Sequence, residues 1–387
     1  MPRYSTALRA SKKTAAPFTI GVEEEYFVVD ARTLDCVKRM PRRFHREAKA
    51  AFGERLTREI LQSMIEISTP VCATADEALA HLSTTRRSLG EIARHHDLRI
   101  LGTGAHPFAD WRDQIHTDKP RYKDMAETLQ ALAVRLHFCG LHVHCAVPDP
   151  SRRIDVMNRL LPFLPLFLAL SSSSPFWRGH STGLVSYRAA GYSELPRSGL
   201  PAPFENAQEY ELFVRKMVRA RAIPDASHLW WTIRPSTRFP TLELRIADSC
   251  PSAADAAMVA ALYQALVRFL VRRPSFGRDW RPHYWPIIEE NRWRALRYGT
   301  DASFIDPRNG RAKPFKVSLN AFLNLIAVDL QALGSKRYAT HARALARQGS
   351  PGVRQLRLYD GMRGKGVGSM KAIRRIAGQL ADETERG

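Results

Sequence analysis

The sequence predicts a protein of α/β or α+β class, in which strands and helices alternate along the chain. Short runs rich in β-branched and aromatic residues, such as 18–30, are separated by segments with helical periodicity. Charged side chains recur at alternate positions of several strand-like runs, so that they share one face. One face of the predicted sheet is therefore expected to form the floor of a site.

Each element is predicted from its local pattern. The predicted strands cover 17–30, 58–68, 98–101, 138–147, 229–233 and 241–247. The predicted helices cover 74–96, 120–136, 151–171, 206–221, 252–272, 288–298, 314–334, 336–348 and 367–384. Thr74 and Glu77 have capping-box spacing. The longest apolar run, 160–170, is too short to span a bilayer and contains two prolines, which predicts a buried, kinked helix.

Composition limits the class of protein. The net charge of +21 comes from 59 basic and 38 acidic residues. This positive charge is compatible with binding to nucleic acid or to a polyanionic small substrate such as ATP. It would also arise in an Arg-rich genome without any function. The basic residues are spread along the chain without an aromatic RNA-binding signature. The five cysteines show no Cys-x-x-Cys spacing, which disfavours a disulfide framework and indicates the cytoplasm.

Three consecutive acids lie in the first predicted strand. Glu23 and Glu25 share a face, whereas Glu24 points to the other face. Glu is depleted in strands, and two carboxylates about 7 Å apart repel each other and resist burial. A cation bound between Glu23 and Glu25 would explain why two carboxylates share one face of a strand. The alternative is an edge strand whose polar face is in contact with solvent.

Three further strands carry polar residues in the same way. Glu66 lies among apolar neighbours. It is either another ligand that points into the site or a surface residue on a half-exposed strand. His142 and His144 share a face, in the arrangement of a metal-binding pair, and Gly140 just before them would permit a ligand to approach the backbone closely. Glu243, Arg245 and Ala247 also share a face. Glu243 and Arg245 form either an ion pair or a metal ligand beside a phosphate-binding arginine.

Together these strands predict a site for hard cations. Its candidate ligands are Glu23, Glu25, Glu66, His142 and Glu243. Such a carboxylate-rich set suits Mg²⁺, with Mn²⁺ also possible, and indicates phosphoryl chemistry on a nucleotide. Because no Walker-type glycine loop is present, the metals and arginines such as Arg234 would hold the nucleotide.

Six motifs in order resemble the ATP-dependent carboxylate–amine ligases, specifically the glutamate–cysteine ligase type 2 family. They are Gly21-Val-Glu-Glu-Glu25, the strand from Glu66 to Pro70, Gly104-Ala-His-Pro107, Cys139-Gly-Leu-His-Val-His144, Ser174-Pro-Phe-Trp177 and Arg234-Pro-Ser with Pro-Thr-Leu-Glu-Leu-Arg245. The resemblance implies an α+β, glutamine-synthetase-like fold, with a curved, mainly antiparallel sheet forming a funnel and helices outside.

The resemblance also implies roles for individual residues. Its metal ligands correspond to Glu23, Glu25, Glu66, His142 and Glu243. Arg245 corresponds to the arginine at the transferring phosphoryl group, with Arg234 as a second catalytic candidate. Arg188 and His144 are expected, with Arg245, to bind the nucleotide or substrate. Ala105 and Ser181 stand where the family often has Thr and Asp, which leaves the substrate open.

The expected activity is ATP-dependent amide formation through an acyl phosphate, with glutamate and cysteine as the family's usual substrates. We expect a basic flexible tail over 1–16, a catalytic domain over 17–305 and a helical extension over 306–387 packed on it. A cytoplasmic homodimer acting on small molecules is expected, with no nucleic-acid or membrane partner. The alternatives are a zinc hydrolase using His142, His144 and His106, and a basic nucleic-acid-binding protein.

Overall fold

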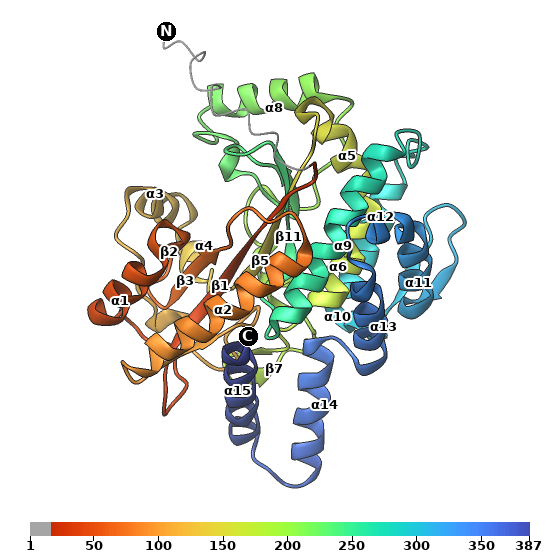
Figure 1. Cartoon of the computed structure of the whole chain (residues 1–387). Helices are drawn as coiled ribbons and strands as arrows, with labels where there is room; N and C mark the ends of the chain where they lie inside the picture. Colours follow the sequence, from red (N-terminus) through yellow and green to blue (C-terminus); the bar gives the residue numbers. More distant parts are fainter. Residues whose placement is uncertain (1–16) are drawn as a thin grey trace.

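A seven-stranded sheet with antiparallel pairing forms the centre of the computed structural model, which describes residues 17–387 (Figure 1). Its strand order is β10-β11-β5-β1-β3-β2, and β4 also pairs with β1. The long central strand β1 therefore contacts three strands that lie far apart in the sequence. The expected tail over 1–16 lies outside the described residues.

The strands agree with most of the predicted runs. The main sheet comprises β1 (Ile20–Asp30), β2 (Leu56–Arg58), β3 (Met64–Ser68), β4 (Leu98–Leu101), β5 (Gly140–Ala146), β10 (Ile233–Pro235) and β11 (Thr241–Asp248). Three two-stranded sheets comprise β6 (Phe176–Trp177) with β7 (His180–Ser181), β8 (Ser198–Gly199) with β9 (Trp230–Trp231), and β12 (Ser303–Ile305) with β13 (Ala312–Pro314). The single strand predicted over 58–68 is wrong: it is two strands, β2 and β3, separated by a turn.

The helices surround this sheet. They are α1 (Arg42–Phe52), α2 (Ala75–Arg94), α3 (Pro120–Leu129), α4 (Ala131–Val134), α5 (Arg153–Leu160), α6 (Leu164–Ser171), α7 (Tyr187–Tyr192), α8 (Ala207–Arg219), α9 (Ala253–Arg272), α10 (Tyr284–Tyr298), α11 (Phe315–Leu325), α12 (Ala327–Ala332), α13 (Lys336–Gln348), α14 (Pro351–Gly364) and α15 (Ser369–Arg386). Short 3₁₀ turns lie at Gly53–Arg55, Trp111–Asp113, Pro150–Arg152, Leu161–Phe163, Ala226–His228 and Gly299–Asp301. The sequence analysis did not predict α1, α7 and α14.

Local signals explain several helix boundaries. The backbone N–H of Glu77 donates to Oγ1 of Thr74 at 3.2 Å, and that of Ala73 donates to the Glu77 carboxylate at 2.7 Å. The predicted N-cap at Thr74 is therefore confirmed, whereas the Glu77 carboxylate binds the N–H of Ala73 instead of the N–H of the N-cap residue itself. The apolar run is also confirmed as a buried helix interrupted by the 3₁₀ turn Leu161–Phe163. Pro162 lies in this turn, and Pro165 lies in the first turn of α6.

One face of the sheet packs on helices. Alternate residues of β1, β5 and β11, including Val22, Val143 and Leu244, join α6 and α9 in one buried cluster. At the other end, Tyr26 and Ile67 pack with α1 and α2. The residues on this face are apolar because helices cover it, and the polar face is left for the cavity.

Glu24 is the exception on the covered face. It points away from Glu23 and Glu25, as predicted, but it is fully buried and forms an ion pair with Arg86 of α2. The Arg86 guanidinium also donates to the carbonyl oxygens of Cys250 and Pro251 at 2.9 and 2.6 Å. Glu24 therefore fixes Arg86, which in turn holds the turn after β11.

A β-bulge changes the end of β11. Leu244 pairs with Val143, but Ala247 rather than Ile246 pairs with Leu141. The predicted position of Ala247 on the face of Glu243 and Arg245 is therefore wrong, because the extra residue reverses the alternation, and Ala247 joins the buried cluster behind the sheet.

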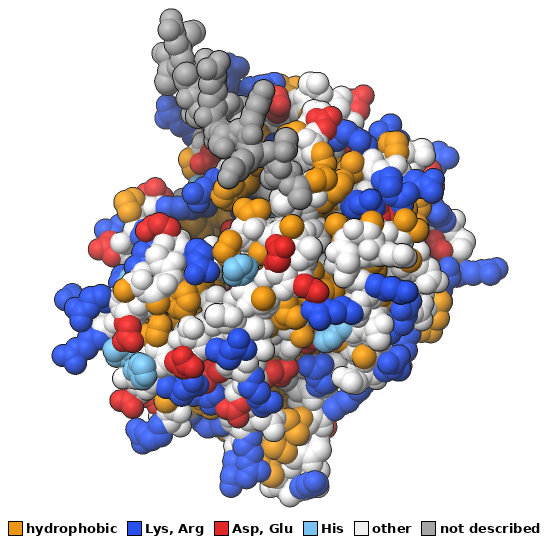
Figure 2. Space-filling model, in the orientation of Figure 1, with side chains coloured by type: hydrophobic (Ala, Val, Ile, Leu, Met, Phe, Trp, Pro, Cys, Tyr) orange, Lys and Arg blue, Asp and Glu red, His pale blue; other side chains and the backbone are white. Residues whose placement is uncertain are grey.

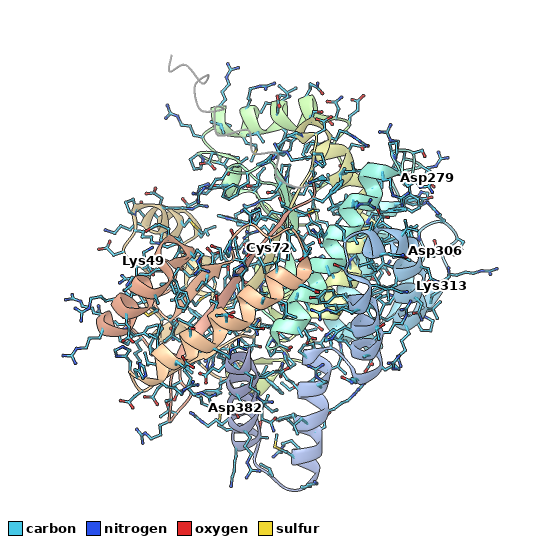
Figure 3. The ribbon with its side chains drawn as sticks, viewed as in Figure 1. Lys49, Cys72, Asp279, Asp306, Lys313 and Asp382 are labelled. Carbon is cyan, nitrogen blue, oxygen red and sulfur yellow. The ribbon has the colours of Figure 1, made fainter. Side chains whose placement is uncertain are left out.

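The C-terminal helices lie against the same fold. Figure 3 labels Asp382 on α15, and its carboxylate lies 2.7 Å from Arg99 of β4. The backbone N–H of Gly102 donates to Thr384 at 3.0 Å. These contacts attach the end of the chain to the sheet, beyond the region in which the sequence shows motifs.

Two helical stretches, Pro150–Ser171 and Ala253–Arg272, are long and apolar enough to cross a membrane. Within their most apolar windows, 78% and 83% of the residues are buried inside the protein, as expected for core helices. Figure 2 shows Lys and Arg scattered across the visible face among acidic and neutral side chains, without a single basic patch.

Candidate active site

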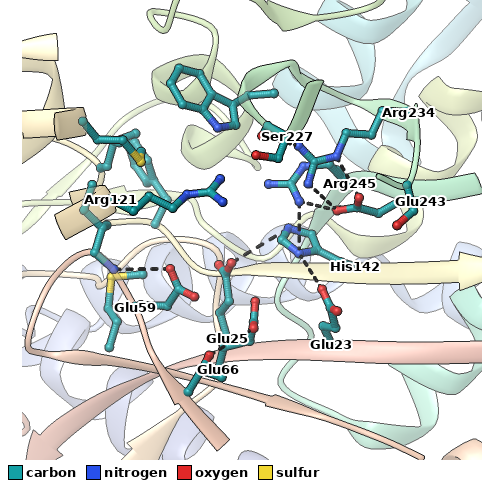
Figure 4. Close-up of a pocket in the computed structure, with 18 of the residues that line it drawn as sticks. Glu23, Glu25, Glu59, Glu66, Arg121, His142, Ser227, Arg234, Glu243 and Arg245 are labelled. Carbon is teal, nitrogen blue, oxygen red and sulfur yellow. Dashed lines mark hydrogen bonds and ion pairs between the residues drawn. The ribbon is translucent and has the colours of Figure 1, made fainter. Parts of the chain in front are cut away.

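A cavity of about 390 Å³ lies over the polar face of the sheet (Figure 4). All the predicted site residues line it: Glu23, Glu25, Glu66, His142, His144, Arg188, Arg234, Glu243 and Arg245. Strand register explains this convergence, because residues that pair across neighbouring strands point to the same face. The pairs Glu25–Glu66, Glu23–His142 and His144–Glu243 form a row across four strands.

Acidic and imidazole groups gather in three overlapping sets whose ligand atoms lie within 4.8 Å of one another. The sets are Glu23 with Glu66 and His142, Glu23 with His144 and Glu243, and Glu25 with Glu59 and Glu66. The sequence analysis identified each of these residues except Glu59 as part of the site. The donor set is rich in carboxylates and fits hard divalent cations such as Mg²⁺.

Glu23 interacts with both histidines of β5. Its carboxylate lies 3.6 Å from Nδ1 of His142 and 3.4 Å from Nε2 of His144. Burial opposes its charge, but hydrogen bonding to the two imidazoles lowers the pKa of Glu23 well below its ordinary value. Burial and the Arg245 charge lower the pKa of His142 to about 4, so this imidazole is neutral at pH 7, the form that binds a metal.

The three carboxylates at the β3 side of the cavity repel one another. Burial and the nearby charge of Glu59 raise the pKa of Glu25 to about 8. Burial and the charges of Glu23 and Glu59 raise the pKa of Glu66 well above its ordinary value. Such a cluster is unfavourable without a counter-ion, and a divalent cation would remove the repulsion.

Glu243 is held by two arginines. Nε of Arg234 donates to it at 2.7 Å, and Nη1 of Arg245 donates to its other oxygen. Burial acts against the charge, but Arg245 and Arg234 lower the pKa of Glu243, which stays ionised. Nη2 of Arg245 donates to the hydroxyl of Tyr192 at 3.2 Å, and its buried Nε has no partner among the described residues. Arg245 can therefore still donate to a bound anion.

Gly140 leaves space for two of these side chains. A Cβ atom at this position would lie 3.0 Å from Nε2 of His142 and would collide with the guanidinium of Arg188. The sequence analysis expected a ligand to approach Gly140 closely, but these protein side chains occupy that space. Arg188 itself donates to the carbonyl of Arg245 at 3.2 Å and lies 3.8 Å from Asp248, so it also supports the end of β11.

The zinc trio of the hydrolase alternative does not assemble. His142 and His144 face the cavity, but His106 is fully buried and does not line it. Nε2 of His106 lies 2.9 Å from the carbonyl of Leu34, and its Nδ1 accepts the backbone N–H of Ala109 at 2.9 Å. Its role is structural, and this alternative is wrong in its choice of ligands.

Several lining residues were missed from the sequence. Glu59 follows β2, and its place in the predicted strand hid its turn toward the cavity. Arg121 lies on α3, Tyr192 ends α7, and Trp230 belongs to β9. Elements outside the main sheet carry these three, and alternation within a strand gives no signal for them.

Comparison with known proteins identifies the family. The model of glutamate–cysteine ligase family 2 (GCS2) matches residues 19–373. The chain belongs to this family. The match includes most of the C-terminal helices, which the sequence motifs did not reach.

The relatives cover the chain almost completely. A Rhodospirillum rubrum protein named "Putative glutamate--cysteine ligase 2" is 42% identical over 371 residues, which are 95% of each chain. A protein of the same name from Jannaschia sp. is 39% identical over 95% of this chain and 96% of its own length. The predicted membership of the family is confirmed.

Solved structures share the fold at low identity. The crystal structure of glutamate–cysteine ligase from Francisella tularensis in complex with AMP has a TM-score of 0.72 and 12% identity, covering 96% of this chain and 89% of that one. A bifunctional glutathione synthetase from Pasteurella multocida has a TM-score of 0.65 and 13% identity, covering 95% of this chain and 52% of that one. The predicted glutamine-synthetase-like α+β fold is confirmed.

Proposed function

We propose that this member of the GCS2 family is an ATP-dependent carboxylate–amine ligase of the glutamate–cysteine type. The observation that carries the proposal is the row of carboxylates and imidazoles on four neighbouring strands, with the guanidinium of Arg245 beside Glu243 and His142 on the same face of the sheet. Phosphoryl transfer requires this combination of cation ligands and a positively charged donor. The names of the relatives supply the amide-forming class.

The residues present fit Mg²⁺, with Mn²⁺ as a second possibility. Glu23, Glu25, Glu66, His142 and Glu243 would hold the ions, and Glu59 joins Glu25 and Glu66 in the third set. Bound ions would neutralise phosphate charge during transfer. The raised pKa values of Glu25 and Glu66 are consistent with carboxylates arranged for a cation.

The first proposed step is phosphorylation of a substrate carboxylate. One carboxylate oxygen attacks the γ-phosphorus of ATP, the bond to the ADP oxygen breaks, and an acyl phosphate forms. Arg245 donates to the transferring phosphoryl oxygens, a contribution worth several kcal/mol in comparable sites. Glu243 orients Arg245 and Arg234, because both guanidiniums donate to its carboxylate. Arg188 and His144 stay candidates for binding nucleotide or substrate.

The second proposed step forms the amide. The amine nitrogen attacks the acyl carbon, the carbon–oxygen bond to phosphate breaks, and the nitrogen loses one proton. A carboxylate facing the cavity accepts this proton. Glutamate and cysteine are the proposed acid and amine, following the names of the relatives, and a cytoplasmic homodimer acting on small molecules is the proposed state of the enzyme.

A coupled assay of ADP release tests the function. The purified protein is incubated with ATP, Mg²⁺ and a panel of amino acids and amines, and amide products are identified by mass spectrometry. We expect ADP and amide in equal amounts, and loss of both in Glu243→Gln and Arg245→Ala. Glu47→Gln, which changes an exposed carboxylate outside the cavity, is the matched control. Amide formation without ATP, or full activity of the two site variants, would contradict the proposal.

A further inference from the structure

Asp248 is a fully buried carboxylate at the end of β11, and the proposed reaction assigns no role to it. Its Oδ2 accepts the backbone N–H of Ser173 at 3.0 Å and the hydroxyl of Ser174 at 2.7 Å. Its Oδ1 accepts the hydroxyl of Ser186 at 2.8 Å. Burial raises the pKa of Asp248, and the charge of Arg188 opposes that rise. Donors from two separate segments of the chain therefore meet on one carboxylate.

The two serine hydroxyls also stabilise the first turn of α7. Oγ of Ser174 accepts the backbone N–H of Arg188 at 3.2 Å. Oγ of Ser186, the N-cap residue, accepts the backbone N–H of Ala189 at 3.2 Å. The first N–H groups of a helix have no partner within the helix, so these contacts satisfy two of them. Because a hydroxyl has one proton and a carboxylate only accepts, both hydroxyl protons point to Asp248, which thereby orients the two serines toward α7.

Arg188 is the second residue of α7, and its side chain lines the cavity. Its guanidinium donates to the carbonyl oxygens of Ile246 at 3.4 Å and Arg245 at 3.2 Å, and it lies 3.8 Å from Asp248. The main chain of Arg188 is thus attached to Asp248 through a serine, and its side chain is attached to the end of β11. The position of the guanidinium depends on both attachments.

Two of the six sequence motifs, those that begin at Gly104 and Ser174, meet at Asp248 and contribute no residue to the cavity. A Cβ atom at Gly104 would lie 2.5 Å from Oδ2 of Asp248 and 2.8 Å from Oγ of Ser174. The backbone N–H of Gly104 donates to Oγ of Ser173 at 2.9 Å, and Gln355 of α14 donates to the carbonyl of Ser173 at 2.8 Å. These contacts enclose the carboxylate and its serine donors from several sides.

We propose that Asp248 is a positioning residue that acts through Arg188: by orienting Ser174 and Ser186, it determines where α7 begins and where the Arg188 guanidinium lies in the cavity. The inference rests on the proposed ligase function, in which Arg188 binds nucleotide or substrate. It adds a residue outside the cavity on which that binding depends. Replacing Asp248 therefore weakens binding of the same ligand that Arg188 contacts.

Steady-state kinetics of Asp248→Asn, Arg188→Gln and the double variant test the proposal. The Asn side chain replaces one accepting oxygen by a donor, so one serine hydroxyl loses its acceptor. Arg188→Gln should raise the KM for one of ATP, the acid and the amine roughly 10- to 100-fold, and Asp248→Asn should raise the KM for the same substrate about 10-fold. The double variant should stay within about twofold of Arg188→Gln, because the second change acts only through the first.

Amide hydrogen exchange tests the arrangement independently of activity. Peptides that cover α7, analysed by mass spectrometry, should exchange about 10-fold faster in Asp248→Asn, because the N–H groups of Arg188 and Ala189 lose oriented acceptors. Ser186→Ala should have the same effect, and it replaces Asp248→Asn in both experiments if that variant does not fold.

Asp329→Asn is the matched control. Asp329 is another fully buried carboxylate, it pairs with Arg268 and Arg272, and it lies outside the cavity. This substitution should lower the melting temperature but leave the KM values and the exchange of α7 as in the wild type.

Three results would overturn the proposal: losses that multiply in the double variant, wild-type KM values in Asp248→Asn despite a lower melting temperature, or unchanged exchange of α7. The second result would assign Asp248 to stability alone. Failure of the wild type to release ADP with any acid and amine would instead contradict the ligase function. In that case the exchange experiment still decides whether Asp248 positions α7.

Discussion

Gly140 and Arg188 are in direct contact, because the missing side chain of the glycine leaves the space that the Arg188 guanidinium fills. The backbone N–H of Gly140 also donates to Oε2 of Glu25 at 2.6 Å. One residue at the start of β5 therefore positions a cavity carboxylate and a cavity guanidinium together.

Gly140→Ala should reduce the rate of ADP release about 10- to 100-fold, because the added Cβ displaces Arg188 and His142 from their positions. The free energy of unfolding should fall by about 1 to 3 kcal/mol, as for overpacked cores. Steady-state kinetics and thermal melting measure the two effects. Gly361→Ala, where a Cβ atom meets no neighbour within 4 Å, is the control and should keep wild-type activity. Unchanged kinetics in Gly140→Ala would show that the contact has no role in catalysis.

The substitution Glu24→Gln should lower stability while Glu23→Gln and Glu25→Gln lower activity. Glu24 is buried against Arg86, and removing its charge leaves an unpaired guanidinium in the core, which costs about 3 kcal/mol. Glu23 and Glu25 face the cavity, so their replacement should spare the melting temperature. Chemical denaturation and ADP release, measured on the same preparations, separate the two effects. A Glu24→Gln protein as stable as the wild type, or one that is stable but inactive, would contradict this division of roles.

Strand alternation was sufficient to predict most of the candidate site. Glu23, Glu66, His142 and Glu243 lie on one face because each alternates with apolar neighbours that pack on helices. That signal is local, and the antiparallel register then brings the residues together. The direction of Glu24 also followed from alternation, but its partner Arg86 did not, since it lies on a helix 62 positions away.

The failures have physical causes as well. Ala247 was placed on the wrong face because a bulge adds one residue, and alternation cannot show an insertion. Glu59 was missed because the predicted strand over 58–68 is interrupted by a turn after β2, so alternation does not give the direction of its side chain. Arg121 was missed because its place at the cavity depends on how α3 is attached to β2, which is a tertiary relationship. The helix α14 was missed because Pro351 and three glycines, at 352, 361 and 364, weaken its helical pattern, whereas its packing stabilises it.

Magnesium should stabilise the protein, and Glu66→Gln should reduce the effect. Glu66 belongs to two of the three ligand sets, and a cation that binds only the folded state adds about 2.7 kcal/mol at 100 times its Kd. We expect the melting temperature to rise with Mg²⁺ in the wild type and to rise by less than half as much in Glu66→Gln. Glu47→Gln should respond like the wild type. A wild-type melting temperature that does not change with millimolar Mg²⁺ would argue against these ligand sets.

Acid should destabilise the fold partly through His106. Burial lowers the pKa of His106 to about 3, while its ordinary value is 6.5. Between these values the unfolded chain binds a proton that the folded protein does not, so stability decreases as the pH falls from 6.5 toward 3. This one group should remove about 2 kcal/mol between pH 7 and pH 5. Urea denaturation at several pH values should therefore give a shallower acid slope for His106→Gln than for the wild type, although the variant is less stable at pH 7 because the ring accepts the N–H of Ala109. Equal slopes for the two proteins would mean that His106 is protonated in the folded state.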